Sequence, residues 1–195
     1  MTIEFTQLGL QSQLEQAVSD LGYVTPTPIQ TKIIPLMLEG HDVIGQAQTG
    51  TGKTAAFALP IIQTLERGRS GIQALVLAPT RELAMQVAKA AHEYGRCLNV
   101  RVLAIYGGQS YSLQINRLRQ GVDIVVGTPG RLLDLIDKGE LVLNQVSTIV
   151  LDEADEMLSM GFIEDIERIL SAVPSERQTA GVLEGLSKLR EKSVQ

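Results

Sequence analysis

Short runs rich in β-forming residues alternate with stretches of helical periodicity along most of the chain, and this alternation restricts the fold more than any other feature. Buried strands are expected at Asp42–Gln46, Ala74–Ala78, Val100–Tyr106, Asp123–Val126 and Thr148–Leu151. Helical patterns fill the intervals, most clearly Thr80–Tyr94, with an N-cap threonine and one apolar face. The order predicts an α/β fold in which helices cover both faces of a mostly parallel sheet.

Two further helices are expected before the first strand. Apolar residues recur at helical spacing from Leu10 to Leu21, and Gly22 follows where a helix would be capped. Thr27 and Pro28 open a second helix that is bent at Pro35 and ends at Gly40. With 195 residues and 44% hydrophobic content, one compact domain is the expected organisation.

The composition excludes some functions and sets the expected compartment. A net charge of −5 provides no global basic field, so a nucleic acid would be held by local contacts. Cys97 is the only cysteine, which rules out an internal disulfide, and we expect it to be a small buried side chain. The N-terminus does not resemble a signal peptide, and no stretch is long and apolar enough to span a membrane. A cytoplasmic location is therefore expected.

A glycine-containing loop lies between the first expected strand and an apolar helix. It consists of Ala47, Gln48, Thr49, Gly50, Thr51, Gly52, Lys53 and Thr54, with Ala47 in place of the first glycine of the general pattern. Gly50 and Gly52 let backbone N–H groups turn toward an anion, and the helix N-terminus adds its positive dipole end. Two glycines alone fit many turns, but the ending Lys53-Thr54 predicts binding of a nucleoside triphosphate and Mg²⁺.

Three carboxylates fall within four residues directly after the expected strand Thr148–Leu151. Asp and Glu also favour the first turn of a helix, which is the simpler explanation of Asp152, Glu153 and Asp155. Beside a phosphate loop, however, Mg²⁺ offsets their repulsion: Asp152 and Thr54 hold the metal, and Glu153 orients or deprotonates the attacking water. The residues alone thus predict a Mg²⁺-dependent nucleoside triphosphatase with Lys53, Asp152 and Glu153 as catalytic residues.

Six motifs, in order, resemble the DEAD-box ATP-dependent RNA helicase family, whose name is the tetrapeptide at Asp152–Asp155. The resemblance covers about Phe5 to Ala180 and implies a RecA-like P-loop lobe, the first of two lobes in such enzymes. Gly22–Gln30 is similar to the family's Q motif. By this resemblance Gln30 hydrogen-bonds the adenine edge of ATP, while Tyr23 and Phe5 lie against the base.

The resemblance also implies an RNA-facing surface. The segments that carry it follow expected strands, where open α/β sheets bind ligands. They contain the candidate RNA-binding residues Pro79, Thr80, Arg81, Gly108, Thr128, Gly130 and Arg131. Arginine side chains and exposed N–H groups there can contact phosphates without reading base sequence. Thr80 and Thr128 are also expected to cap their helices.

The end of the chain departs from the family pattern. After Gln178–Ala180 the family continues into a strand ending in Ser-Ala-Thr, whereas this chain continues as Gly181-Val-Leu-Glu-Gly-Leu186. We therefore expect residues 1–180 to form the ATP-binding lobe, with its last strand missing or replaced. Residues 181–195 are expected to form a divergent amphipathic helical tail, and the second lobe is expected to be absent from this chain.

Two functions remain open. In the first, the chain is the ATP-binding lobe of an RNA helicase, with weak or no activity by itself. In the second, it is a non-catalytic module that binds ATP and RNA or a partner protein. A disrupted, partly folded fragment without a role of its own is a third interpretation of the tail.

Overall fold

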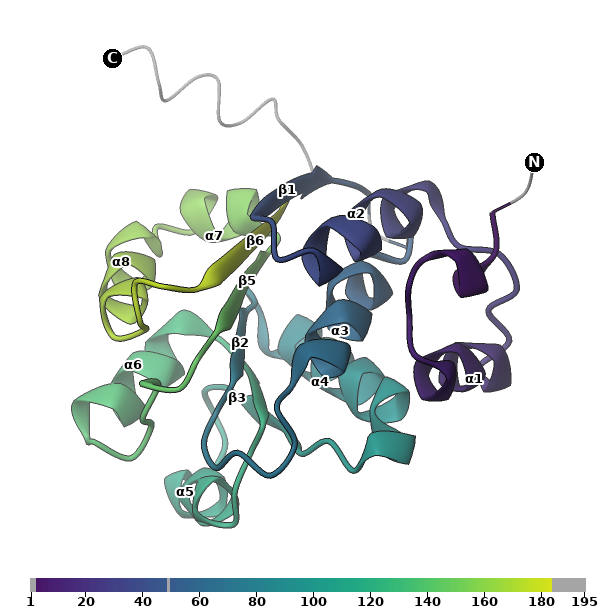
Figure 1. Cartoon of the computed structure of the whole chain (residues 1–195). Coiled ribbons are helices and arrows are strands. Elements are labelled where there is room, and N and C mark those ends of the chain that lie inside the picture. The colour runs from purple at the N-terminus through teal and green to yellow at the C-terminus, as the bar shows by residue number, and fades with distance from the viewer. Residues whose placement is uncertain (1–2, 49, 184–195) are drawn as a thin grey trace.

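A computed structural model of the chain describes residues 3–48 and 50–183, and these residues form a single parallel sheet between two layers of helices (Figure 1). The sheet has six strands in the order β1-β6-β5-β2-β4-β3, and every neighbouring pair is parallel. The strands are β1 (Val43–Gln46), β2 (Ala74–Leu77), β3 (Val102–Ile105), β4 (Ile124–Gly127), β5 (Thr148–Asp152) and β6 (Gln178–Leu183). The predicted α/β fold is confirmed.

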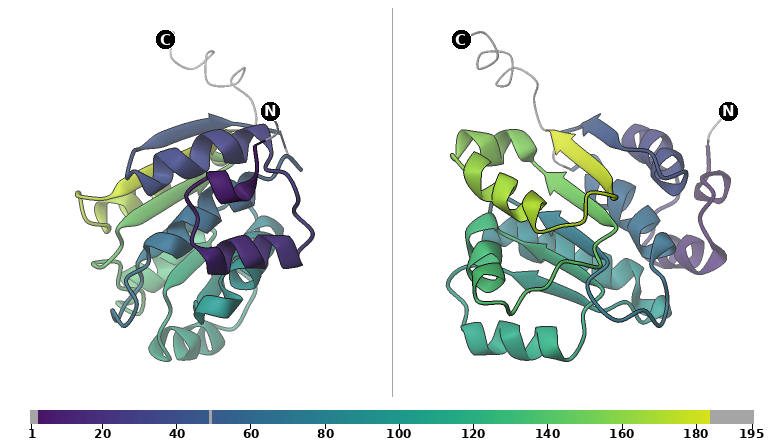
Figure 2. Two further views of the ribbon diagram at one scale, coloured as in Figure 1. Left: turned by 45° about the vertical axis from the view of Figure 1, so that its right-hand side comes forward. Right: turned by 60° about the vertical axis from the view of Figure 1, so that its left-hand side comes forward.

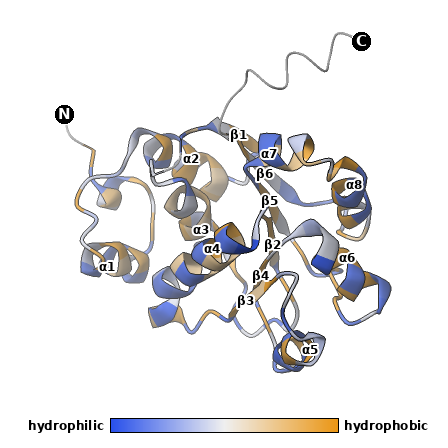
Figure 3. Ribbon diagram, turned by 180° about the vertical axis from the view of Figure 1, so that it is seen from behind, coloured by the Kyte–Doolittle hydropathy of each residue, from blue (hydrophilic) through white to orange (hydrophobic). Residues whose placement is uncertain are grey.

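The helices divide into two groups by the face of the sheet that they cover. One face carries α1 (Ser12–Asp20), α2 (Pro28–Leu38), α3 (Lys53–Thr64) and α4 (Arg81–Tyr94). The other carries α5 (Tyr111–Arg119), α6 (Pro129–Asp137), α7 (Ala154–Ser159) and α8 (Ile163–Ser171). Figure 2 shows the three layers in its right-hand view. In Figure 3 the helices carry both apolar (orange) and polar (blue) residues.

The central strands are buried on both faces, which explains why their sequences are almost purely apolar. All four residues of β2 are buried, and Leu75 and Leu77 are 0% exposed. Side chains of β2 alternate between the two cores, with Ala74 and Val76 facing α3 and α4 and the leucines facing the other layer. Burial of one leucine contributes roughly 1.5–3 kcal/mol, so this strand anchors both layers.

Of the two alternatives expected for the last strand, missing or replaced, the first was wrong, because a strand of divergent sequence is present. Strand β6 is present and lies inside the sheet, paired with β1 on one side and β5 on the other. Residues Gly181–Leu183, expected to begin a helical tail, continue this strand and pair with Ile44–Gln46. Apolar side chains at Ala180, Val182 and Leu183 are buried, so the position suits a strand despite the changed sequence. The remainder of the expected tail, 184–195, lies outside the described residues.

Other expectations had mixed outcomes. Thr80 caps α4, since its side chain accepts a hydrogen bond from Leu83 N at 3.2 Å, whereas Thr128 makes no side-chain cap bond at the start of α6. Cys97 is exposed rather than buried, because it lies in a short 3-10 turn, Arg96–Leu98, at the surface end of α4. Within the part of the chain that the structure describes, no helix has the length and apolar character needed to span a membrane.

Candidate nucleotide and RNA site

The predicted site residues gather along one edge of the sheet. Because all six strands are parallel, the loops that follow them emerge at the same edge. The strand order places the phosphate loop after β1 and the acidic segment after β5 in one half of this edge. The segments that begin with Pro79, Gly107 and Thr128 follow β2, β3 and β4 in the other half. The edge thus separates the nucleotide motifs from the RNA-facing motifs.

The phosphate loop has the backbone geometry of an anion cradle. Gly50 and Gly52 have φ values of +80° and +84°, a region that side chains rarely adopt, and α3 begins at Lys53 directly after them. Ala47 N donates to Leu183 O at 3.0 Å, and Thr51 Oγ1 donates to Gln48 O at 2.6 Å, so both ends of the loop are tethered. Thr49 lies outside the described residues. Among the rest, nothing lies within 4 Å of a Cβ built on Gly50, so that side of the loop is open.

Gln30 connects the expected adenine site to this loop. Its side chain is buried, with 3% exposure, and its Nε2 donates to Gly52 O at 3.2 Å. Its Oε1 accepts from Thr27 N at 2.9 Å, in the first turn of α2. A glutamine amide has two donor hydrogens and two acceptor lone pairs, so these bonds leave one of each for a ligand. Gln30 is held in position from two sides before any base arrives.

The two glycines provide a matched pair for a substitution test. Alanine is strained at both because φ is positive, but only at Gly52 would the new Cβ also collide with the Gln30 amide. We expect Gly52→Ala to weaken ATP binding and lower the unfolding free energy more than Gly50→Ala does. Isothermal titration with ATP and urea unfolding of both variants measure these effects. Equal losses would show that Gln30 is not coupled to the loop.

Lys53 and Glu153 meet across the nucleotide half of the edge. Lys53 Nζ lies 3.6 Å from Glu153 Oε1, and the side chains are 7% and 15% exposed. Among the described residues, Nζ has no hydrogen-bond partner, which is costly for a buried ammonium group. Strand β6 lies between β1 and β5, so the two motifs follow strands that are not neighbours, yet these side chains still meet. A phosphate oxygen would satisfy the donor hydrogens of Lys53.

Glu153 has an unusual backbone. Its φ of 51° and ψ of 49° place it in the left-handed region, where non-glycine residues are uncommon. It forms the junction between the last residue of β5, Asp152, and the first turn of α7. Such strain costs of order 1–3 kcal/mol and is common at functional sites. The conformation gives the chain a sharp turn between β5 and α7.

The oxygen ligands predicted for Mg²⁺ are Asp152 and Thr54. Asp152 is 1% exposed at the end of β5, and Thr54 is the second residue of α3. A carboxylate and a hydroxyl are the hard oxygen ligands that Mg²⁺ prefers. The described residues contain no group of three His, Cys, Asp or Glu side chains arranged to hold a metal by themselves. These residues therefore fit an ion that shares its coordination with substrate phosphates and water, as Mg²⁺ usually does.

The predicted adenine-stacking residues form an aromatic cluster. The rings of Phe5 and Tyr23 are stacked with centroids 6.5 Å apart, and Phe5 is buried while Tyr23 is 39% exposed. Tyr23 also meets Tyr94 edge to face at 6.2 Å, with their hydroxyl oxygens 3.1 Å apart. Burial, together with this hydroxyl pair, raises the pKa of Tyr94 well above its ordinary value. The exposed Tyr23 ring, rather than Phe5, is the one accessible to a ligand.

The other half of the edge, where the family resemblance predicts RNA contacts, contains two arginines in different environments. Arg81 is exposed and pairs with its neighbour Glu82 at 3.1 Å, and its guanidinium lies beside Gly108. The pKa of Glu82 is lowered, first by a hydrogen bond from the backbone of its helix turn and then by Arg81. Thr80 and Gly130 are exposed as well, whereas Pro79 is buried beneath them. Arg81 is therefore free to exchange a surface ion pair for a phosphate.

Arg131 is directed inward instead. Its Nη1 donates to Gln109 O at 2.8 Å and to Gln114 Oε1 at 3.0 Å, and its guanidinium lies 3.9 Å from the centre of the Tyr111 ring. Gln114, which no sequence pattern marks as functional, is 1% exposed and also donates to Tyr106 O at 3.1 Å. It is the fourth residue of α5, and a single glutamine at such a position carries no distinctive pattern. Together Arg131 and Gln114 shape the loop that contains Gly108.

Comparisons with known proteins agree with this arrangement. A family model, DEAD/DEAH box helicase, matches residues 27–182. DEAD-box ATP-dependent RNA helicase CshA of Geobacillus kaustophilus is 57% identical over 90% of this chain and 38% of its own length. ATP-dependent RNA helicase DeaD of Escherichia coli K12 is 55% identical over 90% of this chain and 28% of its own length. A crystal structure of a DEAD box protein from Methanococcus jannaschii has a TM-score of 0.91 at 41% identity, over 97% of this chain and 52% of that chain.

Proposed function

The chain belongs to the DEAD/DEAH box helicase family, and on this premise we propose that it is the ATP-binding lobe of an ATP-dependent RNA helicase. The observation that carries the proposal is the buried Lys53 ammonium, 3.6 Å from Glu153 and without a hydrogen-bond partner among the described residues. A triphosphate placed in the glycine cradle would satisfy Lys53. The chain spans only 38% and 28% of the lengths of the two curated relatives compared above. The helicase activity of a complete, two-lobe enzyme is therefore proposed together with the role of this lobe.

The proposed roles follow from the positions of the side chains. The loop Ala47–Thr54 and Lys53 bind the phosphates, and Thr54 and Asp152 hold Mg²⁺, which offsets the negative charge that develops during phosphoryl transfer. Once phosphate has replaced Glu153 as the partner of Lys53, Glu153 accepts the proton of the attacking water or orients that water. Gln30, fixed by Thr27 and Gly52, uses its remaining donor and acceptor for the adenine edge.

RNA is proposed to bind across the other half of the edge. Arg81, Thr80, Thr128, Gly130 and the N–H of Gly108 are the groups that would contact backbone phosphates, in a manner independent of base sequence. Arg131 would act mainly by holding the Gly108 loop, because its guanidinium already binds Gln109 and Gln114. Strand β5, which ends at Asp152, pairs with β2, which ends at Leu77 two residues before Pro79, so the two halves of the edge adjoin.

A second lobe is proposed to complete the enzyme. In related NTPases an arginine supplied to the phosphoryl group contributes about 10³ to 10⁵ in rate. We therefore propose that the isolated lobe binds ATP but turns it over very slowly. A non-catalytic ATP- and RNA-binding module is the second candidate, because the chain after Ala180 carries Gly181-Val-Leu-Glu in place of the segment leading to Ser-Ala-Thr.

Binding to this chain, and turnover by the chain joined to a second helicase lobe, distinguish these functions. We expect a fluorescent ATP analogue to bind the chain in the presence of Mg²⁺, and unlabelled ATP to displace it more effectively than GTP. Phosphate release by the joined protein is then measured with and without single-stranded RNA. RNA-stimulated release would establish the catalytic lobe, and binding without release would favour the non-catalytic module. Failure to bind ATP with Mg²⁺ present would refute both.

A further inference from the structure

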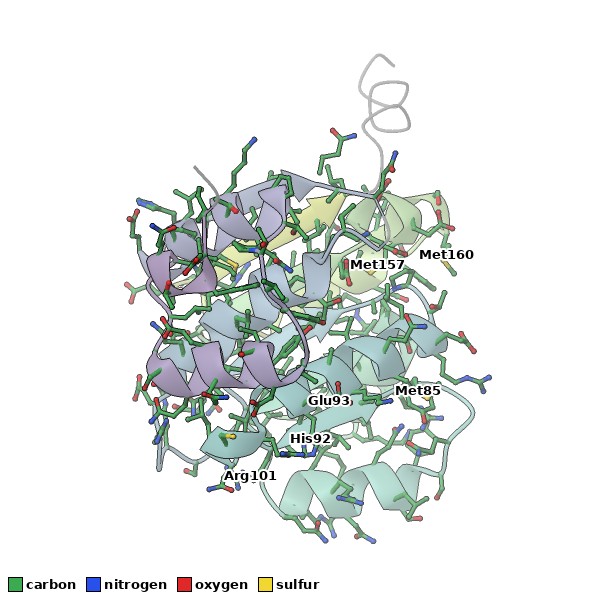
Figure 4. The ribbon with its side chains drawn as sticks, turned by 90° about the vertical axis from the view of Figure 1, so that its right-hand side faces the viewer. Met85, His92, Glu93, Arg101, Met157 and Met160 are labelled. Atoms are coloured by element: carbon green, nitrogen blue, oxygen red, sulfur yellow. The ribbon has the colours of Figure 1, made fainter. Side chains whose placement is uncertain are left out.

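Among the described residues, the outer side of β3 has no partner strand, which leaves a free lateral edge. This β3 edge is distinct from the edge at the carboxyl ends of the strands, where the proposed site lies. Strand β3 is the last strand in the order and pairs only with β4, through Val102–Ile105 and Ile124–Gly127. Figure 4 shows it between α4 and α5, with His92 and Arg101 near one end. The site proposed above lies at the ends of the strands, whereas this surface runs along the side of one strand. The proposed function does not use the backbone groups of β3.

The direction of the backbone groups identifies which atoms are available. Arg101 and Ile105 direct their carbonyl oxygens toward β4, where they accept from Ile124 N at 3.1 Å and Thr128 N at 3.0 Å. Backbone groups alternate along a strand with a period of two residues, so those of Val102 and Ala104 point away from β4. Within residues 3–48 and 50–183 no hydrogen bond joins these groups to another residue. Such a row of donors and acceptors is a template for another strand.

Two clefts form one groove along this edge. One, of about 360 Å³, is lined by Val102–Ala104 together with Leu113 and Arg117 of α5. The other, of about 340 Å³, is lined by His92, Arg101 and again Arg117. Val102, Leu103 and Arg117 belong to both clefts, which makes the groove continuous. Leu113 is 58% exposed, so the groove also offers apolar contact.

The charge of the groove is opposite to that of the chain. Its lining includes His92, Arg101 and Arg117, and neither cleft is lined by a carboxylate. Arg101 is neutralised by Asp123 at 2.6 Å, and the hydrogen bonds that its guanidinium donates to this carboxylate raise the pKa of Arg101. In the described part of the chain, no carboxylate lies within 4.0 Å of Arg117. A cationic groove on a chain of net charge −5 favours an acidic occupant.

We propose that the β3 edge binds an extended acidic peptide segment of another protein, which adds a strand beside Val102 and Ala104. Main-chain hydrogen bonds would supply affinity, and carboxylates facing Arg117 would supply selectivity. A second copy of this chain is disfavoured, because pairing two β3 edges would bring identical cations together. RNA matches the charge but cannot continue a ladder of alternating N–H and C=O groups.

The test uses the full chain and a short acetylated peptide of alternating valine and glutamate, followed by ¹⁵N NMR and amide exchange. We expect the amide signals of Val102 and Ala104 to shift and become protected. Arg117→Glu should weaken binding about ten-fold, the effect of losing one charge-assisted contact. The matched control Arg119→Glu changes a residue of the same helix that pairs with Glu140 and does not line the groove, and should leave binding unchanged.

A backbone variant separates strand addition from simple charge attraction. Ala104→Pro removes an N–H that points away from β4, so the existing ladder is kept while one bond to the peptide is lost. Weaker binding with an unchanged unfolding midpoint supports the proposal. Equal binding by this variant, or by a valine-lysine peptide, would overturn it. The proposal would also be overturned if single-stranded RNA shifts the amide signals of Val102 and Ala104 and the acidic peptide leaves them unchanged.

Discussion

Replacing Lys53 with methionine is expected to weaken ATP binding roughly 10- to 150-fold, because charge-assisted hydrogen bonds contribute about 1.5–3 kcal/mol. Lys53 is the only ammonium group that the structure brings within 4.0 Å of Glu153 among the described residues. Methionine retains the length and apolar contacts of the lysine stem, whose side chain is 7% exposed. Displacement of a fluorescent ATP analogue measures the affinity.

Lys32→Met serves as the control for this substitution. Lys32 lies on α2, two positions from Gln30, and is exposed, so the same chemical change there removes a charge without touching the phosphate loop. We expect its affinity for ATP to match that of the unchanged chain. A Lys53→Met variant that keeps full affinity and folds normally in urea unfolding would disprove the phosphate-binding role.

Replacing Glu153 with glutamine is expected to retain ATP binding and abolish turnover. Glutamine has nearly the same shape, but its amide cannot accept a proton from water, and general-base catalysis contributes typically 10²- to 10⁴-fold. Loss of the ion pair also frees Lys53 Nζ for phosphate, so ATP affinity should stay the same or rise. Turnover is measured on this chain joined to the second lobe of the Geobacillus kaustophilus relative, with RNA-stimulated phosphate release as the readout.

Glu156→Gln is the matched control for Glu153→Gln. Glu156 lies one turn further along, in α7, where it contacts Ser159. The same substitution there should leave turnover within about two-fold of the unchanged protein, as is usual for a residue without contact to the reacting atoms. Normal turnover by the Glu153→Gln variant would remove the water-activating role from Glu153 and assign it to another group.

The element types were predictable because each reflects a local pattern. Five strands and the long helix α4 were expected within a few residues of their bounds, since buried parallel strands and amphipathic helices have distinct periodicities. Strand β6 was missed because Gly181 and the polar residues after Leu183 interrupt the apolar run. Its partner strands β1 and β5 begin at Val43 and Thr148, far apart in the sequence. Pairing of β6 with both strands stabilises a segment whose own pattern is weak.

The site shows the same division between local and tertiary information. The sequence alone predicted the phosphate loop and the acidic segment, because glycine, lysine and carboxylates in this pattern are typical of sites for phosphate and Mg²⁺. Only the tertiary structure decided that Lys53 meets Glu153, that Gln30 binds Gly52, and that Arg131 turns inward to Gln114. Each of these contacts joins residues far apart in the chain, so strand order and packing, rather than local pattern, determine which side chains meet.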